Sequence, residues 1–182
     1  MRLNSLTKTV LGVTITLIVV VVLLSISPIT PAYANDPYMD SNISSAGGMT
    51  NKDIENMNQH EIAWLLSQNQ VFRDSYQVEK DFQGVIYHEK KKRGASFPVL
   101  DIALGTYDTA LKVAQSVHDQ AAKTIGAQWG FDAQGHVTNR DAALQTVMNA
   151  RYSLRDAHYR MVISTHKLHR AYADWHKQFA PR

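Results

Sequence analysis

The fold class follows from the regular spacing of apolar residues in residues 98–129, which read PVLDIALGTYDTALKVAQSVHDQAAKTIGAQW. Mostly apolar or small side chains recur along this stretch in alternating steps of four and three residues, which places them on one line along a helix. The line consists of Leu100, Leu104, Tyr107, Leu111, Ala114, His118, Ala121 and Ile125. This alternation is typical of the contact line of a coiled coil. Pro98 suits the first turn of such a helix, because proline lacks an amide hydrogen that this turn would leave unpaired.

The same alternation predicts a second long helix over residues 138–179. Its contact line is Val147, Ala150, Leu154, Ala157, Met161, Ser164, Leu168, Ala171 and Trp175. Small residues at every second position let a neighbouring backbone come close. Thr138, followed by Asp141 three residues later, matches a capping box at the helix start. A helix of about 40 residues is about 60 Å long and needs a packing partner along its whole length.

A less regular pattern predicts a further helix over residues 51–92. Its apolar positions are Ile54, Met57, Leu65, Phe72, Tyr76 and Ile86, and they are interrupted by Glu61, Gln68 and Glu79. Thr50 and Asp53 match a capping box, and the basic residues before Gly94 suit a helix end. The short connections at 93–97 and 130–138 make neighbouring helices antiparallel. The sequence therefore predicts an all-α protein, an elongated antiparallel three-helix bundle or coiled coil over residues 50–182.

The composition agrees with this fold class and excludes several kinds of site. No long stretch of the mature part alternates with period two, and 9 Gly and 5 Pro in 182 residues argue against a turn-dense β fold. The absence of cysteine excludes a disulfide framework, a thiolate metal site, a cysteine nucleophile and covalent haem attachment.

The first 34 residues have the three zones of a signal peptide. Met1–Lys8 is positively charged, Val10–Leu24 is almost entirely apolar, and Ala32-Tyr33-Ala34 is an A-x-A cleavage site. We predict cleavage after Ala34, with an uncleaved anchor as the alternative because two isoleucines lengthen the apolar run. Both interpretations place the remaining chain outside the cytoplasm, in the periplasm or associated with the outer membrane.

The rest of the N-terminal region has no periodic pattern. Residues 35–49 are polar and contain glycine, which predicts a flexible tether. Removing residues 1–34 takes away two basic residues and no acid, so the net charge falls from +3 to +1. A phosphate-binding surface loses its support, and we expect no nucleic-acid partner. Membrane contact is expected only through the N-terminal segment, if it is uncleaved.

The second turn carries a family resemblance. Residues 131–141, FDAQGHVTNRD, contain a glycine, a threonine three residues later and a nearby aspartate, and an alanine-spaced helix follows. This pattern resembles the periplasmic hairpin of TolC-type outer-membrane efflux proteins. The resemblance covers about a third of the chain and implies a tip that docks against a periplasmic adaptor. Its partner-binding residues would be Gly135, Val137, Thr138 and Asp141.

Two differences from these channels exclude a complete TolC-type protein. The channels have β-strands that form a barrel, whereas this sequence has no strand pattern. Their two hairpin tips face the same end, whereas a single helix over 98–129 would put the two turns here at opposite ends. A fragment-like relative and convergence both remain open.

Histidine is the only residue type whose use is unusual. The chain has eight histidines, and all of them follow residue 34. His166 and His169 have the i,i+3 spacing of a Zn or Cu site, and His176 lies near the azimuth of His169 on the same helix. The alternative is a solvated flank about 90° from the apolar line, a face that also carries Arg151. Because no acidic residue is near enough to complete a ligand set, we favour the solvated flank.

His118 and haem are the remaining candidates for a ligand-related role. His118 lies on the contact line, where we expect a core residue, with a pH-sensitive position as the alternative. Non-covalent haem would need a histidine from residues 170–176 and a methionine such as Met49 or Met57. A periplasmic metal- or haem-binding bundle is therefore the alternative function.

The sequence contains no catalytic motif, and we expect no enzyme. It lacks G-x-S-x-G, P-loop and G-x-G-x-x-G patterns, and Asp101 and Asp108 are best explained as surface charges. The aromatic residues near the helix ends are expected to pack in the core, with a contact surface as the alternative; they are Trp64, Trp129, Trp175 and Phe179. The sequence thus predicts an interaction or structural component of a cell-envelope assembly of the secretion or efflux type. Its partners would be envelope proteins, with self-association also open, and no cofactor is expected.

Overall fold

The computed structural model describes residues 48–94 and 96–179. Met49–Arg182 is one compact unit, and it contains every helix considered below. The predicted export signal and most of the predicted tether lie outside the described residues.

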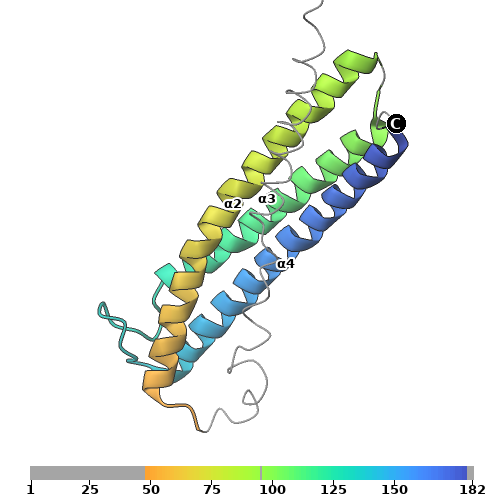
Figure 1. Cartoon of the computed structure of the whole chain (residues 1–182). Coiled ribbons are helices and arrows are strands. Elements are labelled where there is room, and N and C mark those ends of the chain that lie inside the picture. The colour runs from red at the N-terminus through yellow and green to blue at the C-terminus, as the bar shows by residue number, and fades with distance from the viewer. Residues whose placement is uncertain (1–47, 95, 180–182) are drawn as a thin grey trace, which may run out of the picture. The chain divides into compact units, whose positions relative to one another are not determined.

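The unit Met49–Arg182 consists of three helices in the described part of the chain: α2 (Asn51–Arg93), α3 (Pro98–Gly126) and α4 (Arg140–Phe179). Figure 1 shows that they lie alongside one another and that each runs antiparallel to the next along the chain. No strand occurs in the described residues, so the all-α prediction is confirmed. The two connections, 94–97 and 127–139, lie at opposite ends of α3, as predicted.

The ends of α2 form as the sequence predicts. The Asp53 amide donates to Thr50 Oγ1 at 3.2 Å, and the Thr50 amide donates to Asp53 Oδ2 at 2.8 Å, which completes the capping box. At the other end Gly94 has a left-handed φ of 63°, and its amide donates to the carbonyl of Lys90 at 2.9 Å.

The facing ends of α3 and α4 differ from the prediction. Helix α3 ends at Gly126 and not near Trp129, and Gln128 follows with a φ of 49°. Helix α4 begins at Arg140, where the side-chain oxygen of Asn139 accepts from the Ala142 amide at 3.1 Å. The predicted Thr138 cap is wrong, because the Thr138 amide belongs to the preceding loop and donates to the Gly130 carbonyl.

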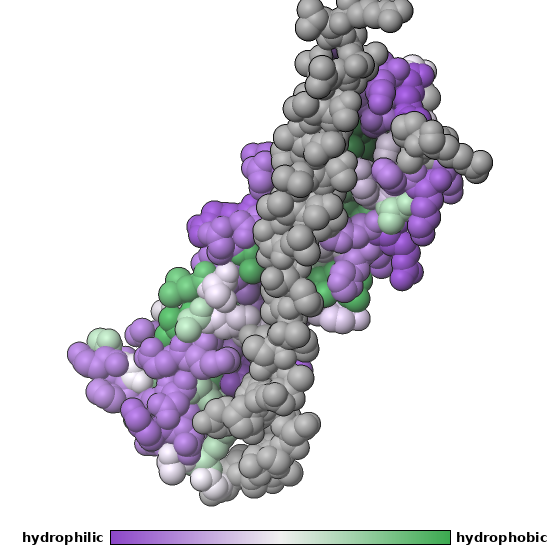
Figure 2. Space-filling model, viewed as in Figure 1, coloured by the Kyte–Doolittle hydropathy of each residue, from purple (hydrophilic) through white to green (hydrophobic). Residues whose placement is uncertain are grey.

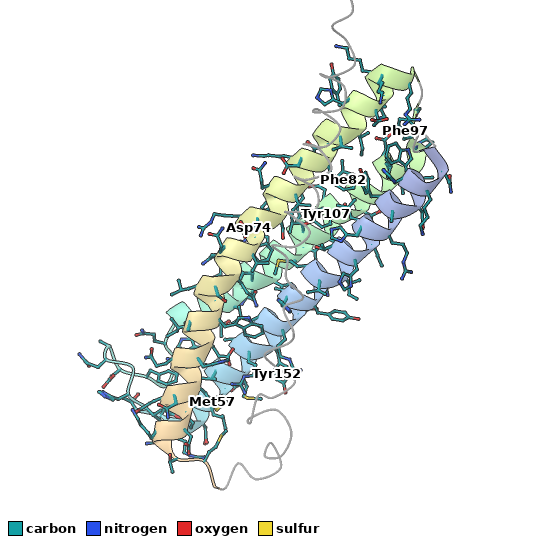
Figure 3. The ribbon with its side chains drawn as sticks, in the orientation of Figure 1. Met57, Asp74, Phe82, Phe97, Tyr107 and Tyr152 are labelled. Atoms are coloured by element: carbon teal, nitrogen blue, oxygen red, sulfur yellow. The ribbon has the colours of Figure 1, made fainter. Side chains whose placement is uncertain are left out.

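The predicted contact lines of α3 and α4 form the centre of the unit. Leu111, Ala114, Ala150, Leu154 and Ala157 have no exposed surface. Most of the close backbone approaches between helices join α3 to α4, which the alanines on their contact lines allow. Toward the connection 94–97 the lines carry larger side chains, of which Leu100, Tyr107 (Figure 3) and Trp175 are buried and Leu104 is half-buried.

Helix α2 covers this pair with a line that includes polar side chains. Ile54, Glu61, Gln68, Ser75 and Phe82 follow one another at intervals of seven residues, and all are buried. The prediction from their polarity, that Glu61 and Gln68 interrupt the buried face, is therefore wrong. Both side chains belong to this face. Each is retained by a partner on α4, because the Gln68 side-chain amide donates to the Leu154 carbonyl at 3.0 Å and Glu61 pairs with Arg151.

None of the described helices combines the length and the apolar character needed to cross a bilayer.

Candidate partner-binding site

The loop between α3 and α4, residues 127–139, has a defined fold of its own. The Gly130 carbonyl accepts from the Thr138 amide at 2.8 Å and from the Asn139 amide at 3.1 Å. Phe131 and Val137 form an isolated antiparallel bridge within this closed loop. The polypeptide therefore returns on itself as a small hairpin whose two sides are joined through the backbone.

The side chain of Asp132 organises the tip of this hairpin. Its Oδ1 atom accepts from the Gln134 amide at 2.9 Å and from the His136 amide at 2.8 Å. These bonds, above all the one from the His136 amide, lower the pKa of Asp132. The carboxylate is therefore charged at neutral pH and acts as an acceptor for the amides of the turn.

The loop requires glycine at position 130. The sequence did not indicate this requirement. The φ of Gly130 is 84°, and a Cβ atom there would lie 2.2 Å from the backbone nitrogen of Ala143 in α4. Gly135 has the same φ, but a Cβ there would meet only the Gln59 side chain, at 3.6 Å. Only Gly130 is thus fixed by close backbone packing, because the loop crosses the first turn of α4 at this point.

The inner side of the loop packs against the first turns of α2. The Val137 amide donates to Glu55 Oε1 at 3.0 Å, and the Val137 side chain lies against a buried cluster. That cluster comprises Ile54, Met57, Phe131, Ala143 and Val147. Of the four partner-binding residues that the resemblance implies, Gly135 and Val137 therefore lie on the side that faces α2.

Other side chains of the loop and of the first turn of α4 are accessible to a partner, and we call this exposed part of the loop its outer side. Thr138 and Asp141 are exposed, and Trp129 is 69% exposed. The prediction that Trp129 packs in the core is wrong, because α3 ends before it and its side chain lies on the surface. The backbone of Trp129 is nevertheless fixed, since its carbonyl accepts from the Thr146 hydroxyl at 3.0 Å.

The other tryptophans follow the prediction more closely. Trp175 is 7% exposed and contacts Phe97 edge to face, with 5.4 Å between the ring centroids. Trp64 is half-buried and lies beside His158, with 6.3 Å between the ring centroids. The side chain of Phe179 lies outside the described residues.

The face of α4 that carries the histidines is only partly solvated. His166 and His176 are exposed, whereas His169 is half-buried. Burial and, to a smaller extent, the charge of His166 lower the pKa of His169. Within residues 48–94 and 96–179, no three His, Asp or Glu side chains are placed to hold a metal ion.

Arg151 does not belong to a solvated flank. It is 9% exposed, and its Nε donates to Glu61 Oε1 at 2.7 Å. His158, two turns further along α4, is half-buried, and burial lowers its pKa. This face of α4 therefore lies against α2 along much of its length.

The residues proposed for haem ligation lie at opposite ends of the unit. Met57 and Met49 contact the cluster at the start of α4, whereas residues 170–176 form its last turns. Figure 3 shows Met57 at the loop end and Phe97, which contacts Trp175, at the other. Because α4 has 40 residues and each adds about 1.5 Å, no single haem iron bridges these two groups.

The remaining candidates have structural explanations. His118 is 3% exposed, its Nε2 lies 3.3 Å from the Leu65 carbonyl, and its ring meets Phe72 edge to face. Asp101 pairs with Lys90 and Asp108 with Lys112, each at 2.7 Å. His118 therefore joins α3 to α2 within the core, where it was expected, and the two carboxylates, which were expected to be surface charges, each form an ion pair.

No protein-family model matches this chain, and no curated protein and no solved structure is similar to it.

Proposed function

We propose that this chain is an exported, non-catalytic interaction component of a cell-envelope assembly, and that it binds its partner through the outer side of loop 127–139. The observation that carries the proposal is the exposure of Trp129, at 69%, on a loop that backbone hydrogen bonds hold in one conformation. Tryptophan is enriched among the residues that dominate binding energy at protein interfaces.

The fixed conformation of the loop favours binding. A loop that is already ordered loses little conformational entropy when a partner docks, so more of the contact energy appears as affinity. The hydrogen bonds of Gly130 and Asp132 supply this order. Thr138 in the loop and Asp141 in the first turn of α4 add an exposed hydroxyl and an exposed carboxylate to the surface.

The resemblance to TolC-type hairpins supports a periplasmic adaptor protein as the partner. The structure changes which residues carry this proposal. Thr138 and Asp141 remain in it, Trp129 is added, and Gly135 and Val137 support the loop from the side that packs on α2.

The export part of the proposal depends on the N-terminal sequence. Cleavage after Ala34 predicts that the protein isolated from the envelope has a mass lacking residues 1–34. An intact mass with residues 1–34 retained would identify the uncleaved anchor, and recovery of the protein from the cytoplasmic fraction would contradict export.

Photo-crosslinking tests the binding part. A photoreactive aromatic residue at Thr138 is expected to give a covalent adduct with one envelope protein in intact cells. The same residue at Tyr152, which is 55% exposed on α4, is the matched control for a surface position outside the loop. Equal adducts from both positions, or none from Thr138, would argue against binding at the loop.

A further inference from the structure

Helix α3 has a second regular line of side chains, on the side opposite its buried contact line. The line is Val99, Ile102, Thr106, Thr109, Val113, Ser116 and Gln120, again in alternating steps of three and four residues. All seven are exposed, Val99 at 66%, Ile102 at 69% and Val113 at 42%. A helix with contact-line spacing on two opposite sides is suited to packing against two neighbours, and only one side of α3 is covered within the unit Met49–Arg182.

The whole exposed line is free of charge. The charged residues of α3 lie on the flank that faces α2. There Asp101 pairs with Lys90 of α2, and Asp108 pairs with Lys112 within α3. The opposite flank consists of Ala103, Ala110 and Val117, which are half-buried. An uncharged face that is about half the circumference of a helix is more typical of a contact surface than of a solvated one.

The hydroxyl groups of the two threonines at the centre of the line already have hydrogen-bond acceptors within α3. The Thr106 hydroxyl donates to the Ile102 carbonyl at 2.8 Å, and the Thr109 hydroxyl donates to the Gly105 carbonyl at the same distance. Their donors are thus satisfied within α3. Covering these residues would leave no hydroxyl proton unpaired, so the desolvation cost is small.

We propose that this face binds a second copy of the chain, with the two α3 helices antiparallel about a two-fold axis near Tyr107 and Asp108. The line is self-complementary in this register, as a two-fold contact requires. Val99 lies opposite Ser116 of the second copy, Ile102 opposite its Val113, and Thr106 opposite its Thr109. A large side chain thus meets a smaller one at both ends, and each pairing occurs twice.

The charges on the flank are compatible with this arrangement. Lys112 lies across from Gly105 of the second copy, where no side chain competes with it, and the half-buried alanines of the two copies meet on the other flank. A parallel pairing would instead place each residue against its own equivalent, with Ser116 against Ser116 at one end. The antiparallel register therefore packs the line more completely.

The size of the contact sets the expected affinity. The paired part of α3, residues 99–116, is about 25 Å long at 1.5 Å per residue. A contact of one helix per copy is smaller than the standard interface of about 800 Å² per partner. We therefore expect a reversible dimer with a dissociation constant on the order of micromolar.

Sedimentation velocity of the protein as isolated from the envelope, at concentrations from about 1 to 100 μM, measures this equilibrium. Ile102→Glu is expected to weaken the dimer at least tenfold, because it places a carboxylate at two symmetry-related positions of the contact. Leu66→Glu, at a position of α2 that is 63% exposed, is the matched control and should leave the dissociation constant unchanged. Circular dichroism verifies that both variants keep the helical content of the wild type.

The absence of cysteine from the chain allows the register to be measured with one introduced label. Spin labels at Ser116→Cys are expected about 25 Å apart in the antiparallel dimer, because 17 residues of helix rise separate the two positions. The proposal would be overturned if the wild-type protein stayed monomeric, or if Leu66→Glu weakened the dimer as much as Ile102→Glu. Labels about 10 Å apart, as in a parallel pair, would also overturn it.

Discussion

Glu61 and Arg151 form a buried ion pair between α2 and α4, although 90 residues separate them in the sequence. The distance from Nε of Arg151 to Oε1 of Glu61 is 2.7 Å, and the two side chains are almost completely buried. The second carboxylate oxygen of Glu61 has no hydrogen-bond partner among the described residues. His60 Nδ1 also lies 3.4 Å from Oε1, but its ring is exposed and the contact is longer. The guanidinium is therefore the main compensation for burying this carboxylate, and the pair fixes how α2 lies along α4.

Removal of one partner of this pair is expected to be costly. Arg151→Met leaves the Glu61 carboxylate buried without its counter-charge, and the free energy of unfolding should fall by about 3–5 kcal/mol. Urea denaturation, followed by circular dichroism, measures the change.

The double variant Glu61→Leu with Arg151→Met is the control. It removes both charges and leaves apolar side chains of similar size, so its stability should be close to that of the wild type. A loss below about 1 kcal/mol in Arg151→Met, or no recovery in the double variant, would show that the pair does not fix α2 on α4.

The two glycines of the loop separate backbone strain from close packing. Gly135→Ala should cost about 1 kcal/mol, because an alanine with positive φ is strained but has space. Gly130→Ala carries the same strain and also forces the start of α4 to shift, which adds about 2 kcal/mol. Thermal unfolding of the two variants side by side gives the difference, and equal losses would show that the loop does not need Gly130 against Ala143.

Acid is expected to weaken the fold through two histidines. The folded-state pKa values of His158 and His169 lie below the usual value of 6.5, so the unfolded chain takes up protons first as the pH falls. The free energy of unfolding should therefore decrease as the pH falls through 6.5, and it should be largest above this pH.

Urea denaturation at pH 7.5 and pH 5.5 measures this dependence. Asp53 and Asp132 have lowered pKa values, so their contributions are lost only below the ordinary carboxyl value of 3.8, outside this window. The double variant His158→Gln with His169→Gln should show a smaller difference between the two pH values. A wild type equally stable at both would contradict the account.

The contact between α3 and α4 could be predicted because the residue types on its contact lines, small or apolar, are those expected in a helix interface. The alternating steps of three and four residues hold small or apolar side chains at almost every position from Leu100 to Ala121 and from Val147 to Trp175. Local signals also identified the start of α2 at Thr50 and its end at Gly94, because a capping box and a left-handed glycine depend on neighbouring residues alone.

The errors arise where tertiary contacts decide the role of a residue. Glu61 and Gln68 are polar, so they look like surface positions until Arg151 and the Leu154 carbonyl are known to lie opposite them. Their spacing of seven residues from Ile54 was the available signal. Gly130 carries no local signal, because its requirement comes from the approach of the loop to Ala143 in α4.

The exposure of the candidate residues could be predicted only in part, because two of the four residues that the resemblance implies are exposed and the other two face α2. The resemblance pointed to residues 131–141, and Thr138 and Asp141 are exposed there. The exposure of Trp129 could not be predicted, because the end of α3 at Gly126 depends on the loop that follows and cannot be seen in the apolar spacing. The contact of Val137 with α2 could not be predicted either, because it joins residues 82 positions apart, Glu55 and Val137.

Partner binding through loop 127–139 is tested by capturing envelope proteins from native envelopes with Trp129→Ala and with the wild type. Trp129 is 69% exposed, so its removal should change the free energy of unfolding by no more than about 0.5 kcal/mol. Quantitative mass spectrometry should show at least a tenfold loss of one envelope protein with this variant and no loss with Tyr152→Ala. Undiminished capture by a folded Trp129→Ala variant would contradict partner binding through the loop.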